Sequence, residues 1–248
     1  MGKDIVNHSV NDILVQGAFP LFFLDYYGTA HLNTNEVTNF VKGLSEACIE
    51  NGHIPLIGGE TAEMPSIYIE GKTDLVGCII GLKDERFFQN TEITSGDVLI
   101  GIPSVSPHTN GYSLINKIFD ENGLPDEELI KTLLKPHKSY LNEVKEFIDY
   151  FGFDAIKGMC HITGGGLQEN LSRVIPKELS IALNKSALDD ALPDWCKYLQ
   201  EKGNITNEEL YRVFNCGIGF VLIVSKETEN NEIFKNVTYK YSRVGEVV

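Results

Sequence analysis

Apolar residues recur at helical spacing near the start of the chain, from Asp4 to Gly17. Residues three and four apart lie on the same side of a helix, so this spacing predicts an amphipathic helix. The apolar stripe consists of Val6, Val10, Ile13, Leu14 and Gly17, and a polar stripe consists of Asp4, His8, Asp12 and Gln16. Such a helix can present Asp12 to a metal, although a solvated polar face is the more common explanation of such a stripe.

Strand patterns dominate the remainder of the first hundred residues. The first strand pattern is followed by a helix pattern, with Asn33 or Thr34 as N-cap and Gly52 at its C-terminal end. The expected strands span residues 20–29, 54–57, 74–82 and 97–102. Asp25 is embedded in the first strand, so its carboxylate must face a site, a partner or solvent.

The pattern changes near Pro103, where Pro103 and Pro107 bracket serines. We therefore expect two domains, residues 1–102 and 103–248. In the second domain, helices are expected at 113–121, 139–151, 167–174 and 195–202, and strands at 157–162 and 217–224. Residues 186–193 are expected to be irregular, and a capping box is expected from Thr206 to Glu209. From residue 235 onward we expect a hairpin or edge strands. Helix and strand patterns do not alternate strictly, which favours an α+β fold with helices on one face of each sheet.

Composition narrows the classes of partner. The 248 residues are 42% hydrophobic and 23% charged, as in a globular protein, and the net charge of −14 disfavours nucleic acid and anionic membrane as partners. The five cysteines are odd in number and form no CxxC pair, so neither a zinc knuckle nor a disulfide framework is expected. The sequence has no apolar run of membrane-spanning length and no signal-peptide pattern, so a cytoplasmic location is expected.

The segment Leu56–Pro65 combines two glycines with two acids. It predicts a sharp turn at which backbone amides approach an anion and Glu60 holds the hard cation that accompanies phosphates. The alternative is a turn at the end of a strand with two solvated acids.

A second glycine-rich segment, Thr163–Gly166, lies between an expected strand and an expected helix. Free amides and the positive end of a helix bind phosphate at such positions, and a flexible turn is the alternative. The segment fits neither GxGxxG nor the P-loop, which disfavours a Rossmann enzyme and a P-loop NTPase.

The segment Ser106–Ser113 places an imidazole and an amide ahead of a helix. His108 can act as an acid, a base or a hydrogen-bond donor, although loop histidines are more often structural. Cys216, in a glycine-rich segment before a strand, is a weak candidate for a nucleophile because close backbone packing explains the glycines equally well.

Seven ordered blocks closely resemble the aminoimidazole ribonucleotide synthetase (phosphoribosylformylglycinamidine cyclo-ligase) family. The blocks are Val10–Ala18, Leu21–Tyr27, Gly58–Pro65, Gly96–Ile100, Pro107–Ser113, His161–Gly166 and Phe214–Gly219. The resemblance covers nearly the whole chain and implies a two-domain α+β fold. It also implies a homodimer in which the N-terminal domains join their sheets into a barrel, with the ATP site close to that pairing.

The resemblance implies an ATP-dependent carbon–nitrogen ligase of purine biosynthesis. Its substrate is formylglycinamidine ribonucleotide, and its products are aminoimidazole ribonucleotide, ADP and phosphate, with ATP and Mg²⁺ as cofactors. Transferred residue by residue, Asp12 and Glu60 resemble the acids that bind magnesium and the ATP phosphates. The other implied site residues are Asn11, Gly58, Gly59 and Thr61 around the nucleotide, Thr163, Gly164, Gly165 and Gly166 in an anion cradle, and the catalytic pair His108 and Asn110 over the reacting amidine.

The sequence departs from the family at its start, where a glycine-rich ATP loop and an Asp-Gly-Val-Gly-Thr-Lys block are absent. We therefore expect that family sequence is missing upstream, and that this chain alone binds ATP weakly and turns over slowly or not at all. Three alternatives remain: a non-catalytic dimerising remnant, a subunit that needs a separate N-terminal chain, and a sister ATP-dependent amide- or selenium-activating enzyme.

Overall fold

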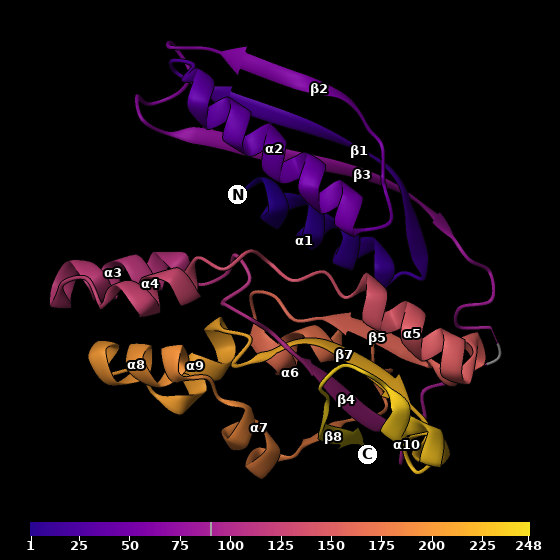
Figure 1. Ribbon diagram of the computed structural model, residues 1–248. Helices are drawn as coiled ribbons and strands as arrows, with labels where there is room; N and C mark the ends of the chain where they lie inside the picture. The colour runs from indigo at the N-terminus through magenta and orange to yellow at the C-terminus, as the bar shows by residue number, and fades with distance from the viewer. Residues whose placement is uncertain (90) are drawn as a thin grey trace. The chain divides into compact units, whose positions relative to one another are not determined.

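The chain divides into two compact units, Met1–Asp84 and Glu85–Val248, in a computed structural model that describes residues 1–89 and 91–248 (Figure 1). Each unit has its own sheet with helices packed on it, which confirms the α+β class. The sequence pattern placed the boundary after residue 102, whereas the observed division follows Asp84. The reason is that β4 (Val98–Pro103) pairs with two strands of the second sheet and therefore belongs to the second unit.

The first unit packs two helices against a three-stranded sheet. In chain order its elements are α1 (Gly2–Leu14), β1 (Ala18–Thr29), α2 (Thr34–Glu50), β2 (Leu56–Glu63) and β3 (Thr73–Lys83). The strand order is β2-β1-β3, with β2 parallel and β3 antiparallel to β1. Phe23 and Tyr27 of β1 are buried beneath the helices, where the Tyr27 ring lies 5.4 Å from that of Phe40 on α2. Alternation along the strand assigns Asp25 to this same face.

The two glycines of the Leu56–Pro65 segment do not turn the chain, contrary to the sequence prediction. Gly58 and Gly59 continue β2 and pair with Leu24 and Asp25 of β1. A Cβ on Gly59 would lie 2.5 Å from both the carbonyl oxygen and Oδ1 of Asp25. Glycine is required there because the neighbouring strand comes so close, which is a common reason for glycine inside a strand.

The other face of this sheet carries exposed apolar side chains. On β3, Val76, Ile80 and Leu82 are 49%, 41% and 65% exposed. Val76 pairs with Tyr26, whose hydroxyl lies 2.8 Å from that of Tyr68. The first unit therefore has one face covered by its own helices and one open face.

The second unit is built around a five-stranded antiparallel sheet of order β5-β7-β4-β8-β6. Its helices are α3 (Tyr112–Asn122), α4 (Glu127–Leu133), α5 (Leu141–Phe151), α6 (Gly166–Ser172), α7 (Lys185–Ala191), α8 (Asp194–Gly203), α9 (Asn207–Val213) and α10 (Lys226–Glu229), with short 3-10 turns η1 (Phe153–Ala155) and η2 (Glu232–Asn236). Its strands besides β4 are β5 (Gly158–His161), β6 (Ile181–Leu183), β7 (Ile218–Val224) and β8 (Ser242–Val247). All seven residues of β7 are buried, so this strand forms the centre of the core.

Several predicted elements of the second unit differ from the observed ones. Residues 186–193 were expected to be irregular, but α7 covers most of them, with Asn184 as N-cap accepting from the amide of Ala187. The C-terminal segment forms β8, which lies between β4 and β6 and so is neither a hairpin nor an edge strand. The predicted cap at Thr206 is confirmed, since its hydroxyl accepts from the amide of Glu209. Within residues 1–89 and 91–248, no helix has the length and apolar character that crossing a membrane requires.

Candidate functional site

Three predicted segments of the second unit meet at one edge of its sheet. β4 and β5 both run antiparallel to β7, so their C-terminal ends lie beside the N-terminal end of β7. The loop after β4 contains His108 and Asn110, the turn after β5 contains Thr163–Gly166, and the segment before β7 contains Asn215. Sheet topology thus brings together residues that are about 50 positions apart in the sequence.

Asn110 connects two of the segments that the sequence analysis singled out. The amide of Gly164 donates to its Oδ1 over 3.0 Å, and its Nδ2 donates to the carbonyl oxygen of His108 over 2.7 Å. The predicted pair His108 and Asn110 and the predicted glycine turn are therefore parts of one hydrogen-bonded arrangement.

Asn170 of α6 shapes the glycine turn, although it was not predicted from the sequence as a site residue. This side chain is 4% exposed, and its Nδ2 donates to the carbonyl oxygens of Thr163, Gly164 and Gly166 at 3.3, 3.2 and 2.8 Å. The C=O and N–H of one peptide unit point in opposite directions, so the amides that follow these carbonyls point away from Asn170. Arg173 donates to Asn170 Oδ1 over 3.2 Å, and its guanidinium is also ion-paired with the carboxylate of Glu169.

The glycines of the turn serve different purposes. Gly165 and Gly166 have φ angles of 98° and 63°, in the region that favours glycine. A Cβ on Gly166 would lie only 1.8 Å from the carbonyl oxygen of Tyr211, so packing against α9 also requires glycine there. Around Gly164 a Cβ would meet only Asn110 Oδ1, at 3.5 Å. Gly164 is thus the glycine of this turn that leaves room for a bound group.

His108 is fully buried and stacks on His137, with ring centroids 4.3 Å apart. Its Nε2 accepts from the amides of Val105 and Lys138 at 3.3 and 3.4 Å, which places the single N–H hydrogen of the neutral ring on Nδ1. His108 and Thr109 both have positive φ, 53° and 64°, so the loop is held in an unusual conformation. These contacts give His108 a structural role in the loop, and its catalytic role stays a prediction.

Asn215 holds the start of the same loop, a role that was not predicted from the sequence. It is 1% exposed, its Oδ1 accepts from Ser104 Oγ and the Gly217 amide, and its Nδ2 donates to the Ser106 carbonyl oxygen at 2.9 Å. A signal for it existed in the sequence, because a polar residue directly before a buried strand needs buried partners. Cys216 next to it is buried, with its Sγ 3.5 Å from the Leu210 carbonyl oxygen, so the structure gives no support to a nucleophilic role.

In the first unit, Asp12 and Glu60 are associated with opposite faces of the sheet. Asp12 is on α1, which packs on the helix-covered face, and its carboxylate lies 3.1 Å from Nε2 of His8. Glu60 pairs with Tyr26, so it points to the open face. Within the described residues, neither carboxylate belongs to a group of three or more candidate metal ligands. The structure therefore does not bring these two acids of one chain to a common cation.

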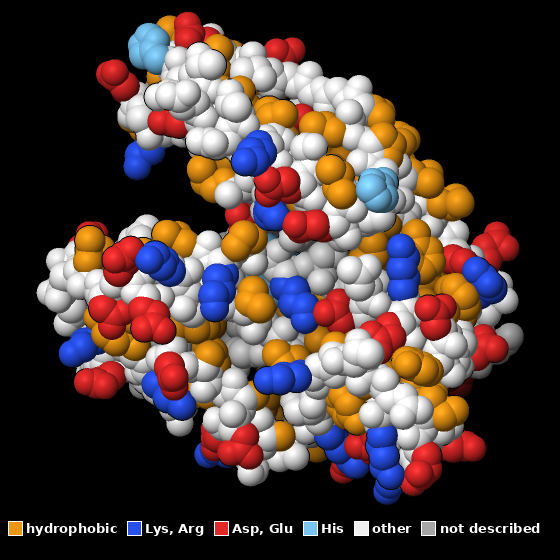
Figure 2. Space-filling view, in the orientation of Figure 1, with side chains coloured by type: hydrophobic (Ala, Val, Ile, Leu, Met, Phe, Trp, Pro, Cys, Tyr) orange, Lys and Arg blue, Asp and Glu red, His pale blue; other side chains and the backbone are white. Residues whose placement is uncertain are grey.

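The other predicted nucleotide residues of the first unit are spread in the same way. Asn11 is fully buried between the helices and the sheet, whereas Gly58 and Thr61 are exposed on β2. The embedded acid Asp25 faces α2, and burial raises its carboxyl pKa above the ordinary value. Across the face seen in Figure 2, acidic and basic side chains are interspersed rather than gathered into one basic patch.

Comparison with protein families matches both units. The AIR synthase related protein N-terminal domain matches residues 1–83, and the C-terminal domain of the same family matches residues 94–248. Among curated relatives, phosphoribosylformylglycinamidine cyclo-ligase of Xanthomonas euvesicatoria pv. vesicatoria is 45% identical over 92% of this chain and 68% of its own length. The same enzyme of Xylella fastidiosa is 43% identical over 91% of this chain and 65% of its own length. The chain thus spans about two thirds of the length of these relatives.

Solved structures of lower identity share the fold. Hydrogenase maturation protein HypE superposes with a TM-score of 0.75 at 18% identity, over 99% of this chain and 73% of that chain. Thiamine monophosphate kinase from Aquifex aeolicus superposes with a TM-score of 0.67 at 18% identity, over 99% of this chain and 78% of that chain. At this identity the match concerns the fold alone. The two matched domains and the identities of 43–45% show that this chain belongs to the AIR synthase related family, and that its curated relatives are phosphoribosylformylglycinamidine cyclo-ligases, the ATP-dependent ligases of purine biosynthesis.

Proposed function

We propose that this chain carries out the ring-closing reaction of a cyclo-ligase, in which ATP activates formylglycinamidine ribonucleotide for conversion to aminoimidazole ribonucleotide. An amide oxygen is a poor leaving group, so ATP phosphorylates the formyl oxygen, an amidine nitrogen of the same molecule attacks the carbon, and phosphate departs. Binding keeps the nucleophile and the electrophile of one molecule in contact. The observation that carries the proposal is the hydrogen bond from the Gly164 amide to Asn110, which joins the anion turn to the loop expected over the reacting amidine.

The second unit supplies the proposed substrate side. Asn170 directs the carbonyl oxygens of the turn inward, so the outward amides can donate hydrogen bonds to the phosphate of the ribonucleotide, beside the guanidinium of Arg173, which is paired with Glu169. Asn110 orients the substrate by its amide, and His108 fixes the loop that carries Asn110. Thr163, Gly165 and Gly166 complete the turn.

The first unit supplies the proposed ATP side, with Mg²⁺ as the accompanying cation. Mg²⁺ commonly keeps several waters and takes one or two protein carboxylates together with phosphate oxygens. Asp12 and Glu60 are therefore each proposed as a single ligand, since their placement on opposite sheet faces does not fit one cation held by both acids of the same chain. The substitutions Asp12→Asn and Glu60→Gln test them separately. Each should weaken Mg²⁺-dependent ATP binding, and unchanged ATP affinity removes that residue from the site.

A homodimer is the proposed assembly, with the open face of the first unit as its contact surface. Exposed apolar side chains on one continuous sheet face favour burial against another protein surface, and the second copy offers the same face. Sedimentation equilibrium should give twice the mass of 27.6 kDa for the wild type, and Ile80→Glu should shift the protein toward monomer. A wild-type monomer at micromolar concentration contradicts this assembly.

ADP release in a coupled assay tests the activity. We expect release that requires both Mg²⁺-ATP and formylglycinamidine ribonucleotide, either from this chain alone or after addition of a polypeptide carrying the family's glycine-rich ATP loop. Release only with the added polypeptide identifies the chain as a subunit that needs a second one. No ribonucleotide-dependent release in either case favours a non-catalytic dimerising protein, and release that depends on another amide substrate favours a sister enzyme.

A further inference from the structure

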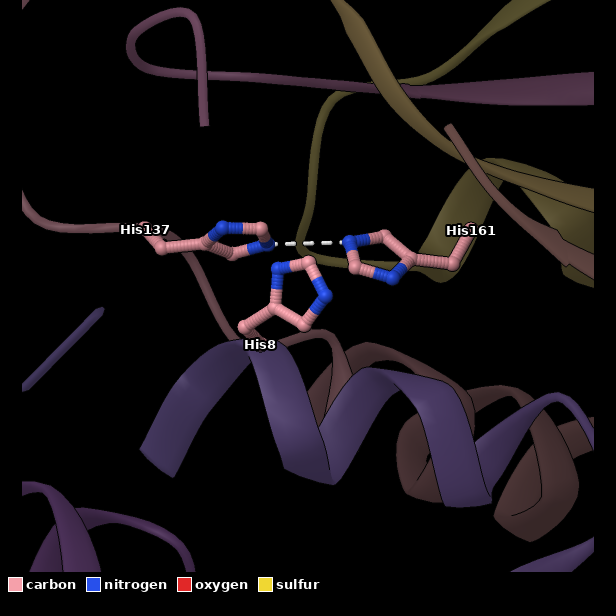
Figure 3. A group of neighbouring side chains, drawn as sticks. All are labelled: His8, His137 and His161. Carbon is pink, nitrogen blue, oxygen red and sulfur yellow. Dashed lines mark hydrogen bonds between the residues drawn. The ribbon is translucent and has the colours of Figure 1, made fainter. Parts of the chain in front are cut away.

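Two buried histidines of the second unit face each other with their ring nitrogens. His137 lies between α4 and α5 and is 1% exposed, and His161 ends β5 and is 6% exposed. Their Nε2 atoms are 2.9 Å apart, as the dashed line in Figure 3 marks. Half of the six histidines of the chain gather here, since His108 stacks on His137. Burying polar rings is costly unless their nitrogens form hydrogen bonds or bind a metal, so we considered which of these this cluster can do.

Neighbouring hydrogen bonds define which nitrogen of His137 carries the hydrogen. The hydroxyl of Thr109 donates its one hydrogen to the His108 carbonyl oxygen over 2.6 Å. Thr109 Oγ1 therefore acts as an acceptor toward His137 Nδ1, which lies 3.4 Å away, and Nδ1 of His137 carries the hydrogen. The lone pair of His137 is consequently on Nε2, the atom that faces His161.

We infer that His137 and His161 form a binding site for one transition-metal ion of Zn²⁺ type, with Nε2 of each ring as ligand and water completing the coordination. Imidazole is a preferred ligand of Zn²⁺, and a hydrogen bond from the other ring nitrogen to an oxygen is the usual way proteins orient such a ligand. Thr109 provides that bond for His137, and the stacked ring of His108 holds its plane, with 24° between the two rings.

The spacing of the two nitrogens suits a shared ion. Two nitrogens that each lie about 2.0–2.1 Å from a tetrahedral Zn²⁺ are roughly 3.3 Å apart, so the rings need to separate by only about 0.4 Å from the hydrogen-bonded arrangement. In the metal-free form His161 donates its Nε2 hydrogen to His137. On metal binding that proton moves to Nδ1 of His161, so the neutral pair binds the ion without net loss of a proton.

Titration of the full chain with Co²⁺ and Zn²⁺ tests this site. Co²⁺ should give visible d–d absorption that saturates at one equivalent, and Zn²⁺ should displace it. His137→Gln and His161→Gln should each weaken Zn²⁺ binding at least tenfold by calorimetry. His31→Gln is the matched control, because His31 is exposed on the first unit and its loss should leave binding unchanged.

A variant that keeps both ligands tests the site even if the glutamine variants fail to fold. Thr109→Val removes the acceptor that orients His137 while leaving both ligands in place, and it should weaken Zn²⁺ binding several-fold with the fluorescence of Trp195 unchanged. The inference is overturned when the wild type binds no Co²⁺ or Zn²⁺ at near-stoichiometric concentration. It is equally overturned when the two glutamine variants bind as the wild type does, since the metal then lies elsewhere.

Discussion

Replacing Gly166 by alanine should destabilise the second unit strongly, because two independent features exclude a Cβ. The φ of 63° costs an L-residue roughly 1–2 kcal/mol. The Cβ would also lie 1.8 Å from the Tyr211 carbonyl oxygen, and the backbone shift needed to relieve such overpacking costs about 1–3 kcal/mol. Loss of glycine freedom in the unfolded chain offsets about 0.4–1 kcal/mol. The net loss of unfolding free energy is therefore expected to be about 1–5 kcal/mol, a large share of the roughly 5–15 kcal/mol of a typical domain.

Urea unfolding followed by tryptophan fluorescence measures this loss in the second unit alone. Trp195 is the one tryptophan of the chain, is buried in the second unit and packs edge-on against Phe214 at 5.6 Å. Gly164→Ala is the matched control, because its φ is not positive and its Cβ would meet only Asn110 Oδ1; it should change stability by less than about 0.5 kcal/mol. A Gly166→Ala midpoint within error of the wild type would refute the reasoning, as would equal losses in both variants.

Two further predictions concern other positions. Burial raises the pKa of Asp25, so its contribution to stability is complete below the unfolded-state pKa and is lost as the pH rises through the folded-state pKa. Asp25→Asn should therefore raise the thermal midpoint at pH 7, with a gain that shrinks toward pH 4; a lowered midpoint at pH 7 would count against it. Asn215→Asp replaces the donor to the Ser106 carbonyl oxygen by an acceptor and should cost about 1–3 kcal/mol in the same urea assay, whereas Asn184→Asp, at a helix cap that accepts aspartate, should be nearly neutral.

Local pattern was sufficient to predict most elements, because helix caps and apolar periods are properties of adjacent residues. The helix cap at Thr206 and the buried strand β7 both follow from their own sequence. The same local view failed at Gly58 and Gly59, which look like a turn but continue β2, and Gly59 is glycine because Asp25 of the neighbouring strand approaches it. It also failed at β8, whose central place in the sheet depends on pairing with β4 and β6, strands distant in the sequence.

Site residues could be predicted from the sequence only where they lie together in one short motif. The Asn110 loop and the glycine turn were singled out as separate motifs, and their contact follows from the strand order of the second sheet. Asn170 escaped notice because an asparagine inside a helix pattern gives no sign that it binds three carbonyl oxygens. Convergence of Asp12 and Glu60 was expected from the family resemblance, but strand alternation places Glu60 on the face that α1 does not cover.

Binding of formylglycinamidine ribonucleotide to the full chain tests the central claim most directly, because it does not depend on turnover. Calorimetry should show saturable binding by the wild type and at least tenfold weaker binding by Asn110→Ala, a loss of about 1.4 kcal/mol or more. The urea transition of the second unit should stay cooperative, with a loss of about 1–3 kcal/mol from the two hydrogen bonds that Asn110 makes. Equal affinity of a folded Asn110→Ala variant, or no binding by the wild type, would contradict the assignment of the Asn110 loop and the glycine turn as the substrate site.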